Sequence, residues 1–361
     1  MRVLQLIDSL EAGGAERMAL NYANALSAEI EFSGLVATRK EGVLKKQLDD
    51  KVHYLFLNKK NTVDFKAVLK LRKYIIRNQV QLIQAHSSSF FLAVLVKLTL
   101  PNIKIIWHDH YGNSEFLENR SKYALQLASF FFNGSIAVNE ILKHWASAHL
   151  YCKNGIYLSN FATIEDTKET KTIVQGQEGK RILCLANLRR QKNHFLLVEV
   201  ATRLKVSHPD WSFHLVGKDF EDNYSHQLKE ILKIRDLQNH VFVYNSCSDV
   251  GKVLEQVQLG VLTSDSEGLP VALLEYALHK KAVVVTSVGQ VSAVVQDGKN
   301  GFLIPAGDVN LFYNRLTELI NNPSLQDRFS ESLYRIVVEQ FSQASIIKKY
   351  IHWINIIIVN E

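Results

Sequence analysis

Short apolar runs and helical patterns alternate along this chain of 361 residues, and the alternation starts afresh near the middle of the chain. Val3–Ile7 and Gln81–Ala85 are typical of buried strands, while Asp64–Asn78 has apolar residues at helical spacing. Apolar strands that alternate with helices form parallel sheets with helices on both faces. The pattern therefore predicts two doubly wound α/β domains in tandem.

The expected strands define the extent of each domain. In the first half they are Val3–Ile7, Glu31–Ala37, Val52–Leu55, Gln81–Ala85, Ile103–Trp107 and Ser135–Val138, and in the second half Arg181–Ala186, Trp211–Val216, Val241–Tyr244, Gln258–Thr263 and Ala282–Thr286. Apolar periodicity lapses at Ser159–Lys171, which places an N-terminal domain at 1–162 and a C-terminal domain at 163–341. The last helix, within 342–361, is rich in isoleucine, and we expect it to pack back on the N-terminal domain.

Charge is distributed unevenly between the two predicted domains. Residues 1–162 carry 20 basic and 13 acidic residues, a net charge of +7, whereas residues 163–361 carry 22 and 23, a net charge of −1. A basic domain favours an anionic partner. The chain begins with no signal-peptide pattern, has no apolar run long enough to span a bilayer, and has three scattered cysteines. We expect a cytoplasmic protein.

The most informative motif runs from Thr263 to Glu275, as Thr-Ser-Asp-Ser-Glu-Gly-Leu-Pro-Val-Ala-Leu-Leu-Glu. A strand ends near Thr263, and Pro270 suits the first position of the helix that follows. Backbone N–H groups at such a helix start, here those of Gly268 and Leu269, bind phosphate readily. Glu267 and Glu275 would lie about 12 Å apart, comparable to the span from a sugar across a diphosphate to a ribose. The alternative is that Glu267 merely complements the helix dipole and Glu275 is a surface residue.

This arrangement of strand, Glu-Gly-Leu-Pro, helix and second glutamate resembles the retaining nucleotide-sugar glycosyltransferases of the GT-B fold, glycosyltransferase family 4. Residues 181–310 carry most of the resemblance, which includes Val216-Gly217, Val283–Gly289 and Val294–Ile304. The resemblance implies two Rossmann-like domains, with the nucleotide sugar held by the second. It also implies that Glu267 lies near hydroxyl groups of the donor sugar and that Glu275 holds the ribose.

A second motif, Ala186–Asn193, follows a strand and opens a helix. A diphosphate leaving group needs positive charge as its bond to the sugar breaks, and Lys192 is placed to supply it. The family usually has Gly-Arg-Leu here, so Asn187 stands where the arginine is expected. We expect Arg189 to substitute for it. A solvated basic turn is the alternative.

Two motifs of the first half complete the candidate site. Gly13 and Gly14 follow the first strand, permit close approach of the backbone to a ligand, and resemble the family's Gly-Gly-Ala-Glu loop. The family also places one histidine after a strand near the donor sugar. His110 fits that place best, with His108 in reserve, and His86 is interpreted as a structural histidine. His108 and His110 are two residues apart and could bind a metal together with Asp109. No further ligand of obvious spacing appears, so no metal or other cofactor is expected.

The basic helix Asp64–Asn78 carries Lys66, Lys70, Arg72, Lys73 and Arg77. It is either a solvated face or a contact with an anionic membrane surface, and in the second case the protein would be peripheral on the inner face of the cell membrane.

The sequence as a whole predicts a retaining glycosyltransferase that moves a sugar from a nucleotide-diphosphate donor to an acceptor hydroxyl, in polysaccharide or glycolipid synthesis. The resemblance implies a saccharide or lipid-linked acceptor. One alternative is a GT-B nucleotide-sugar epimerase. The other is a non-catalytic partner subunit of a two-chain transferase, which two departures from the family pattern keep open: Asn187, and Ala293 where the family often has glutamate. No nucleic-acid recognition motif is present.

Overall fold

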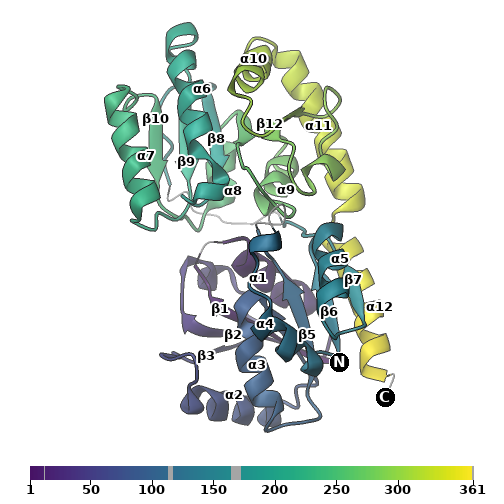
Figure 1. Cartoon of the computed structure of the whole chain (residues 1–361). Coiled ribbons are helices and arrows are strands. Elements are labelled where there is room, and N and C mark those ends of the chain that lie inside the picture. The colour runs from purple at the N-terminus through teal and green to yellow at the C-terminus, as the bar shows by residue number, and fades with distance from the viewer. Residues whose placement is uncertain (12, 113–116, 164–171, 360–361) are drawn as a thin grey trace. The chain divides into compact units, whose positions relative to one another are not determined.

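The computed structural model describes residues 1–11, 13–112, 117–163 and 172–359, apart from the side chains of residues 119 and 359. The chain forms two compact units (Figure 1). Unit 1 comprises Met1–Phe161 and Gln343–Glu361, and unit 2 comprises Ala162–Ser342. Part of the predicted boundary, residues 164–171, lies outside the described residues.

Unit 1 is built on a seven-stranded parallel sheet with the order β3-β2-β1-β4-β5-β6-β7. The strands are β1 Arg2–Ser9, β2 Phe32–Lys40, β3 His53–Phe56, β4 Leu82–His86, β5 Lys104–Asp109, β6 Gly134–Ala137 and β7 Gly155–Tyr157. The helices are α1 Gly14–Leu26, α2 Phe65–Arg77, α3 Phe90–Lys97, α4 Tyr123–Ala128, α5 Glu140–His149 and α12 Gln343–Val359.

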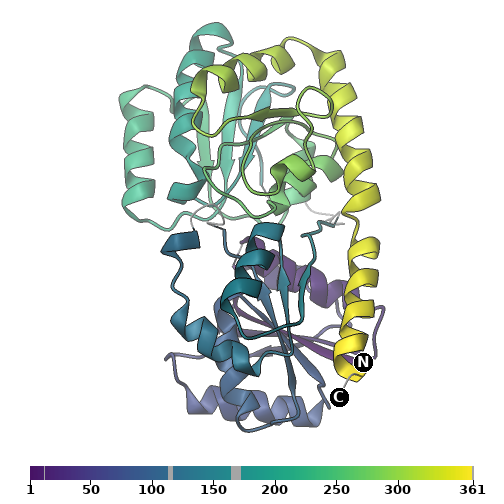
Figure 2. The same cartoon turned by 45° about the vertical axis from the view of Figure 1, so that its right-hand side comes forward.

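The helix α12 belongs to unit 1 although it is the last element of the chain. It lies along the strands of this unit in both views (Figures 1 and 2). Tyr350 and Ile354 are fully buried, and the ring of Tyr350 packs 4.9 Å from that of Tyr22 on α1. Ile357 lies close to Gly134 of β6, where a Cβ atom would come 2.8 Å from its Cδ1.

Unit 2 repeats the architecture on a six-stranded parallel sheet with the order β10-β9-β8-β11-β12-β13. The strands are β8 Arg181–Leu185, β9 Ser212–Val216, β10 Val241–Tyr244, β11 Leu259–Leu262, β12 Ala282–Thr286 and β13 Phe302–Ile304. The helices are α6 His194–Ser207, α7 Asn223–Ile234, α8 Val250–Glu255, α9 Val271–Leu278, α10 Val309–Ile320 and α11 Pro323–Gln340.

The predicted fold class of two parallel sheets with alternating helices is confirmed. Two strands were missing from the sequence expectation, β7 Gly155–Tyr157 and β13 Phe302–Ile304. Each has three residues, which is too few for a period of two to be recognised. Among the described residues, no helix combines the length and the apolar character needed to cross a membrane.

In both sheets, the order of the strands reverses direction at one point. In unit 1 the reversal falls between β1 and β4, and in unit 2 between β8 and β11. In open α/β sheets, ligands bind beyond the carboxyl ends of the strands at such a switch point. The loops after β1, β4, β8 and β11 therefore occupy the positions from which a binding site is built.

Gly289 holds the loop after β12 against the loop after β11. Its φ of +55° lies in the left-handed region, and a Cβ atom there would come 2.6 Å from the carbonyl oxygen of Gly268 and closer still to that of Glu267. The next residue, Gln290, donates its backbone N–H to the same Gly268 oxygen at 2.8 Å. Glycine at position 289 thus lets a second loop brace the backbone of the Glu267 motif.

The substitution Gly289→Ala should lower the free energy of unfolding of unit 2 by roughly 3 kcal/mol, from left-handed strain plus overpacking against Glu267. The matched control is Gly298→Ala, where φ is +69° and no heavy atom from the described part of the chain, its two neighbours aside, lies within 4 Å of the added Cβ. It should cost only about 1–2 kcal/mol of strain. Urea unfolding of both variants measures the difference, and equal losses would contradict the close approach.

Candidate functional site

The switch point of unit 2 brings Lys192 and Glu267 into direct contact. Lys192 lies at the end of a 3₁₀ turn, Arg190–Lys192, that follows β8, and Glu267 lies in the loop after β11. The ammonium group of Lys192 forms an ion pair with Oε1 of Glu267, which also accepts a hydrogen bond from the Ser264 hydroxyl at 2.7 Å. The Glu267 side chain is 7% exposed and that of Lys192 is 19% exposed. A buried carboxylate of this kind requires such partners.

Three further hydrogen bonds hold the two loops together. The Thr263 hydroxyl donates to the backbone carbonyl of Lys192 at 3.0 Å, and the backbone N–H of Asp265 donates to the carbonyl of Gln191 at 2.8 Å. The Asn193 amide donates to Asp265 Oδ1 at 2.8 Å while its oxygen caps α6. The position of the lysine relative to the glutamate is therefore determined by hydrogen bonds between the two loops and not by the ion pair alone.

The helix of the Glu267 motif begins one residue later than expected. Pro270 is the N-cap of α9 in extended conformation, and the helix starts at Val271, so the expectation that proline occupies the first helical position was wrong by one residue. Gly268 and Leu269 are buried immediately before the cap. Glu275 lies on the second turn of α9 and is partly exposed. Its ribose role stays a prediction.

Asn187 and Arg189 make contacts that the sequence did not anticipate. The Asn187 side-chain oxygen accepts a hydrogen bond from the backbone N–H of Lys218 at 2.8 Å and so joins the loops after β8 and β9. Arg189 is exposed, and its guanidinium carbon lies 4.4 Å from the centre of the Phe220 ring, which the Lys218 ammonium approaches to 4.8 Å. Lys218 was missed, although a basic residue directly after the strand-end Gly217 is a recognisable signal.

At the switch point of unit 1, Gly13 caps α1 and Gly14 is its first residue. The φ of Gly13 is −164°, an extended value open to any residue, so the backbone conformation at this position does not require glycine. Apart from its chain neighbours and its own helix backbone, no heavy atom of the described residues lies within 4 Å of a Cβ placed on Gly14. This open space keeps Gly14 a candidate for close approach to a ligand.

Three histidines converge at the carboxyl ends of β4 and β5. His86 and His108 pair across the two strands, and the His86 Nδ1 atom lies 2.9 Å from Nε2 of His110. The ring centres of His108 and His110 are 3.9 Å apart. One nitrogen from each ring can be chosen so that all three lie within 4.8 Å of one another, the spacing of a metal site. His86 thus supplies the third possible ligand, which the sequence alone did not reveal.

The geometry also shows what else holds these residues. Asp109, grouped with the histidines in the sequence, instead makes a bidentate ion pair with Arg120 at 2.8 and 2.9 Å. His86 uses both ring nitrogens, because its Nε2 lies 2.7 Å from Oε1 of Gln5. A metal ion would therefore have to displace existing hydrogen bonds. The expectation that no metal is required stays a prediction.

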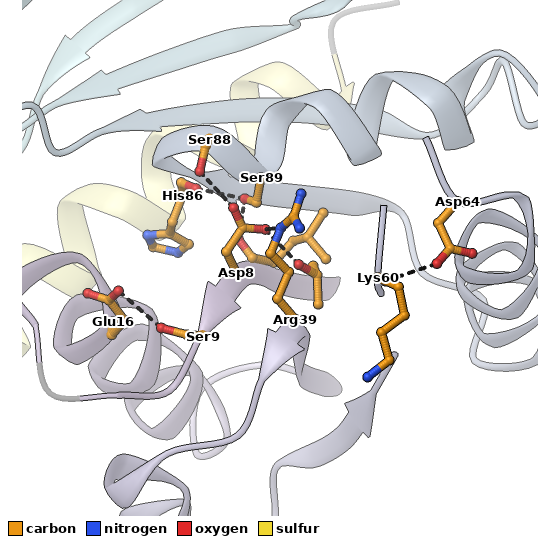
Figure 3. Close-up of polar contacts among 11 residues, drawn as sticks. Asp8, Ser9, Glu16, Arg39, Lys60, Asp64, His86, Ser88 and Ser89 are labelled. Atoms are coloured by element: carbon orange, nitrogen blue, oxygen red, sulfur yellow. Dashed lines mark hydrogen bonds and ion pairs between the residues drawn. The ribbon is translucent and has the colours of Figure 1, made fainter. Parts of the chain in front are cut away.

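A polar cluster around Asp8, at the end of β1, was not recognised in the sequence. The Asp8 carboxylate accepts hydrogen bonds from the hydroxyls of Thr38, at 2.6 Å, and Ser88, at 2.7 Å, and Arg39 lies 4.0 Å away (Figure 3). Figure 3 also shows Ser9 and Glu16 in contact at the start of α1. The available signal was an acid directly after the expected strand Val3–Ile7.

Comparison with known proteins identifies the family. Residues 165–335 match the family model described as glycosyl transferases group 1, and residues 12–153 match the model described as glycosyltransferase family 4. The chain belongs to the group 1 glycosyltransferases. It is a transferase of the glycosyl-transferring class with the GT-B fold.

Relatives and solved structures extend this glycosyltransferase assignment. An uncharacterized glycosyltransferase of Haemophilus influenzae is 26% identical over 94% of this chain and 95% of its own length. The UDP-Gal:alpha-D-GlcNAc-diphosphoundecaprenol alpha-1,3-galactosyltransferase of Escherichia coli is 22% identical over 86% of each chain. The crystal structure of Anabaena HepE in complex with UDP-glucose superposes with a TM-score of 0.80 at 17% identity, covering 98% of this chain and 99% of HepE, which shows the shared fold.

The histidine cluster should make the stability of this glycosyltransferase depend on pH. Burial lowers the pKa of His86 and of His108 well below the ordinary value, and lowers the pKa of His110 to about 3. Unfolded imidazoles take up protons as pH falls through about 6.5, whereas these remain neutral when folded. The unfolded state then binds more protons, so the free energy of unfolding falls as pH falls below about 6.5.

The matching experiment is urea unfolding between pH 4 and pH 8. Each buried imidazole should contribute up to about 1.4 kcal/mol per pH unit on the acid side, and His110→Gln should remove one such contribution. The variant His144→Gln, at an exposed position on α5, should keep the wild-type slope. An unchanged slope in His110→Gln would mean that His110 takes up its proton in the folded state as well.

Proposed function

We propose that this glycosyltransferase moves a sugar from a UDP-sugar to a hydroxyl of a saccharide or lipid-linked acceptor, with retention at the anomeric carbon. The contact between Lys192 and Glu267 at the switch point of unit 2 carries the proposal. HepE is described with UDP-glucose, and the E. coli relative is named for a UDP-Gal donor and a diphosphoundecaprenol-linked acceptor. A role in cell-envelope polysaccharide or glycolipid synthesis follows from this acceptor class.

In the proposed mechanism, Lys192 exchanges partners when the donor binds. Without donor, the ammonium group neutralises the buried Glu267 carboxylate. A diphosphate carries more negative charge than one carboxylate and attracts the ammonium toward its own oxygens. Glu267 is then available to accept hydrogen bonds from hydroxyl groups of the donor sugar. Lys192 stabilises the charge that develops on the leaving diphosphate, which is the step that lowers the barrier.

The other donor and acceptor contacts follow from the same placement. We assign the diphosphate to the backbone at Gly268 and Leu269 before α9, and the ribose to Glu275 on that helix. Asn187 and Arg189, which follow β8, are assigned to the donor side as well. In unit 1, Gly13, Gly14 and His110 lie at the carboxyl edge of the sheet and are assigned to the sugar and its acceptor.

Purified full-length chain should turn over a UDP-sugar in the presence of an acceptor. Lys192→Ala should lower kcat about 100-fold, because one preorganised charge at the leaving group is lost. Glu275→Ala should raise the donor KM roughly tenfold with a smaller effect on kcat, as expected for loss of a hydrogen bond to a charged group. Steady-state kinetics with a panel of UDP-sugars checks both.

The matched control is Lys229→Ala, which removes a lysine from its ion pair with the largely buried Asp219 in the same unit. Its kinetics should equal those of the wild type. Wild-type kinetics in Lys192→Ala and Glu275→Ala would refute the assignment. Donor conversion that needs no acceptor would favour the epimerase alternative, and activity only with a second chain would favour the partner-subunit alternative.

We further propose that α2 rests on an anionic membrane surface. Phe65, Leu69 and Ile76 are 76%, 63% and 51% exposed, although they are apolar. Lys66 and Lys73 are exposed on the same helix, and neither makes an ion pair with a residue that the structure describes. Apolar side chains flanked by basic ones are typical of helices that lie in the plane of a membrane interface.

Double charge reversal of Lys66 and Lys73 to glutamate should weaken binding to vesicles of phosphatidylcholine and phosphatidylglycerol by about 30-fold or more, from about 1 kcal/mol per basic residue. Lys70 is left in place, because its ammonium group donates to the carbonyl of Phe56 at 2.7 Å. The control is the same double reversal at Lys348 and Lys349, which are exposed on α12. Equal binding of the α2 variant and the wild type in a vesicle sedimentation assay would show that α2 is only a solvated face.

A further inference from the structure

Polar side chains form a continuous buried row across the sheet of unit 1. Gln5 of β1 pairs with Gln84 of β4, and His86 of β4 pairs with His108 of β5. All four are at most 1% exposed, as is Tyr350 of α12, which packs above them. Buried polar groups cost free energy unless they are hydrogen-bonded, so the pattern of their bonds decides which atoms carry protons.

One end of the row is the Tyr350 hydroxyl, which donates to Oε1 of Gln84. The same oxygen accepts a hydrogen bond from the Gln5 amide nitrogen at 3.3 Å. With its oxygen engaged in this way, Gln84 directs its own amide nitrogen to Nδ1 of His108, at 2.8 Å. Since an amide nitrogen only donates, Nδ1 of His108 is the acceptor in this pair.

The other branch leads to His110. Oε1 of Gln5 can only accept, so Nε2 of His86, 2.7 Å away, carries a proton. A neutral imidazole has one N–H, which leaves Nδ1 of His86 as an acceptor. Nε2 of His110 lies 2.9 Å from that atom and must therefore carry the proton of His110. The remaining nitrogen of His110, Nδ1, is then unprotonated.

The opposite order of protons requires the amide groups of Gln5 and Gln84 both to turn over. It turns the amide nitrogen of Gln84 toward the oxygen of Tyr350, so the fully buried hydroxyl loses the acceptor that it contacts. Burial keeps the imidazoles neutral and so permits one order at a time, since it lowers the pKa of His86 and His108 well below the ordinary value and that of His110 to about 3.

We propose that Tyr350 is a positioning residue that holds His110 in its Nε2–H tautomer through Gln84, Gln5 and His86. His110 thereby presents Nδ1 as a hydrogen-bond acceptor. This nitrogen has no hydrogen-bond partner among the described residues, and the side chain is partly exposed. A bare ring nitrogen accepts a hydrogen bond from a hydroxyl group and repels phosphate oxygens. His110 therefore selects a hydroxyl of the sugar or acceptor, an assignment that rests on the proposed function.

The same proton order argues against a metal at the three histidines. Nε2 of His108 carries the N–H, and it is buried without a hydrogen-bond partner among the described residues. Both nitrogens of His86 are engaged. Only Nδ1 of His110 keeps a lone pair that no described residue uses, and one imidazole is too few ligands for a stable divalent-ion site.

Nitrogen-15 NMR of the histidine side chains in the full-length protein tests this directly, with His110→Gln used to assign the signals. In the wild type, Nδ1 of His110 should show the shift of a bare nitrogen and Nε2 that of a protonated one. The reversed pattern overturns the proposal. So does a stoichiometric shift of all three histidines on addition of Zn²⁺ alone.

Two variants that each remove one hydroxyl separate positioning from packing. In Tyr350→Phe, the two His110 signals should move toward each other as the second tautomer becomes populated. In Tyr22→Phe they should stay in place, because the Tyr22 hydroxyl has no hydrogen-bond partner among the described residues although its ring contacts Tyr350. Identical signals in wild type and Tyr350→Phe would show that Tyr350 does not set the tautomer.

Kinetics distinguish this inference from the proposed function. With a UDP-sugar and acceptor, kcat should fall about fivefold in Tyr350→Phe, which is the effect of one weakened hydrogen bond, and the donor KM should not change. In Tyr22→Phe, both constants should equal those of the wild type. If NMR shows the Nε2–H tautomer of His110 but neither the wild type nor any variant turns over the donor, the proposed function is refuted and the proton order stands. Turnover together with the reversed tautomer would refute the proton order alone.

Discussion

The requirement that both faces of a parallel sheet be covered by helices determines where this protein can do chemistry. Strands such as β1, β8, β11 and β12 are buried along most of their length, so their side chains serve packing. Ligands are reached only from the loops at the carboxyl edge, and the reversal of strand order opens a space between two of those loops. The Lys192–Glu267 contact, the histidine cluster and the Asp8 cluster all occur at such edges.

At the edge of unit 2, backbone geometry and charge support one another. The loops after β8 and β11 are joined by hydrogen bonds that leave Lys192 and Glu267 facing each other. A largely buried carboxylate is costly without a cation, so Lys192 stabilises Glu267 in this position. Gly289 adds a third loop to this arrangement, because only a residue without a Cβ fits beside the Glu267 backbone.

The core of unit 1 contains buried polar groups as well as apolar ones. Gln5, Gln84, His86 and His108 lie where hydrophobic side chains would pack at no electrostatic cost. Their hydrogen bonds offset part of that cost, and in our proposal they also set the order of the protons. The helix α12 takes part through Tyr350, so the last element of the chain influences the chemistry of a residue that follows β5.

The fold class of this protein could be predicted from its sequence alone. Apolar runs in alternation with helical patterns predicted two parallel sheets, because burial on both faces leaves a pattern in neighbouring residues. The positions of Lys192 and Glu267 in loops after strands were predictable, because each lies in a short motif directly after an apolar run. The partnership of His110 with His86, the pairing of Asp109 with Arg120 and the role of Tyr350 were not. These depend on strand register and helix packing, which bring together residues that are 24, 11 and 266 positions apart and leave no local pattern. Only the tertiary structure decides contacts of that kind, because they are set by which surfaces meet and not by the order of residues along one element.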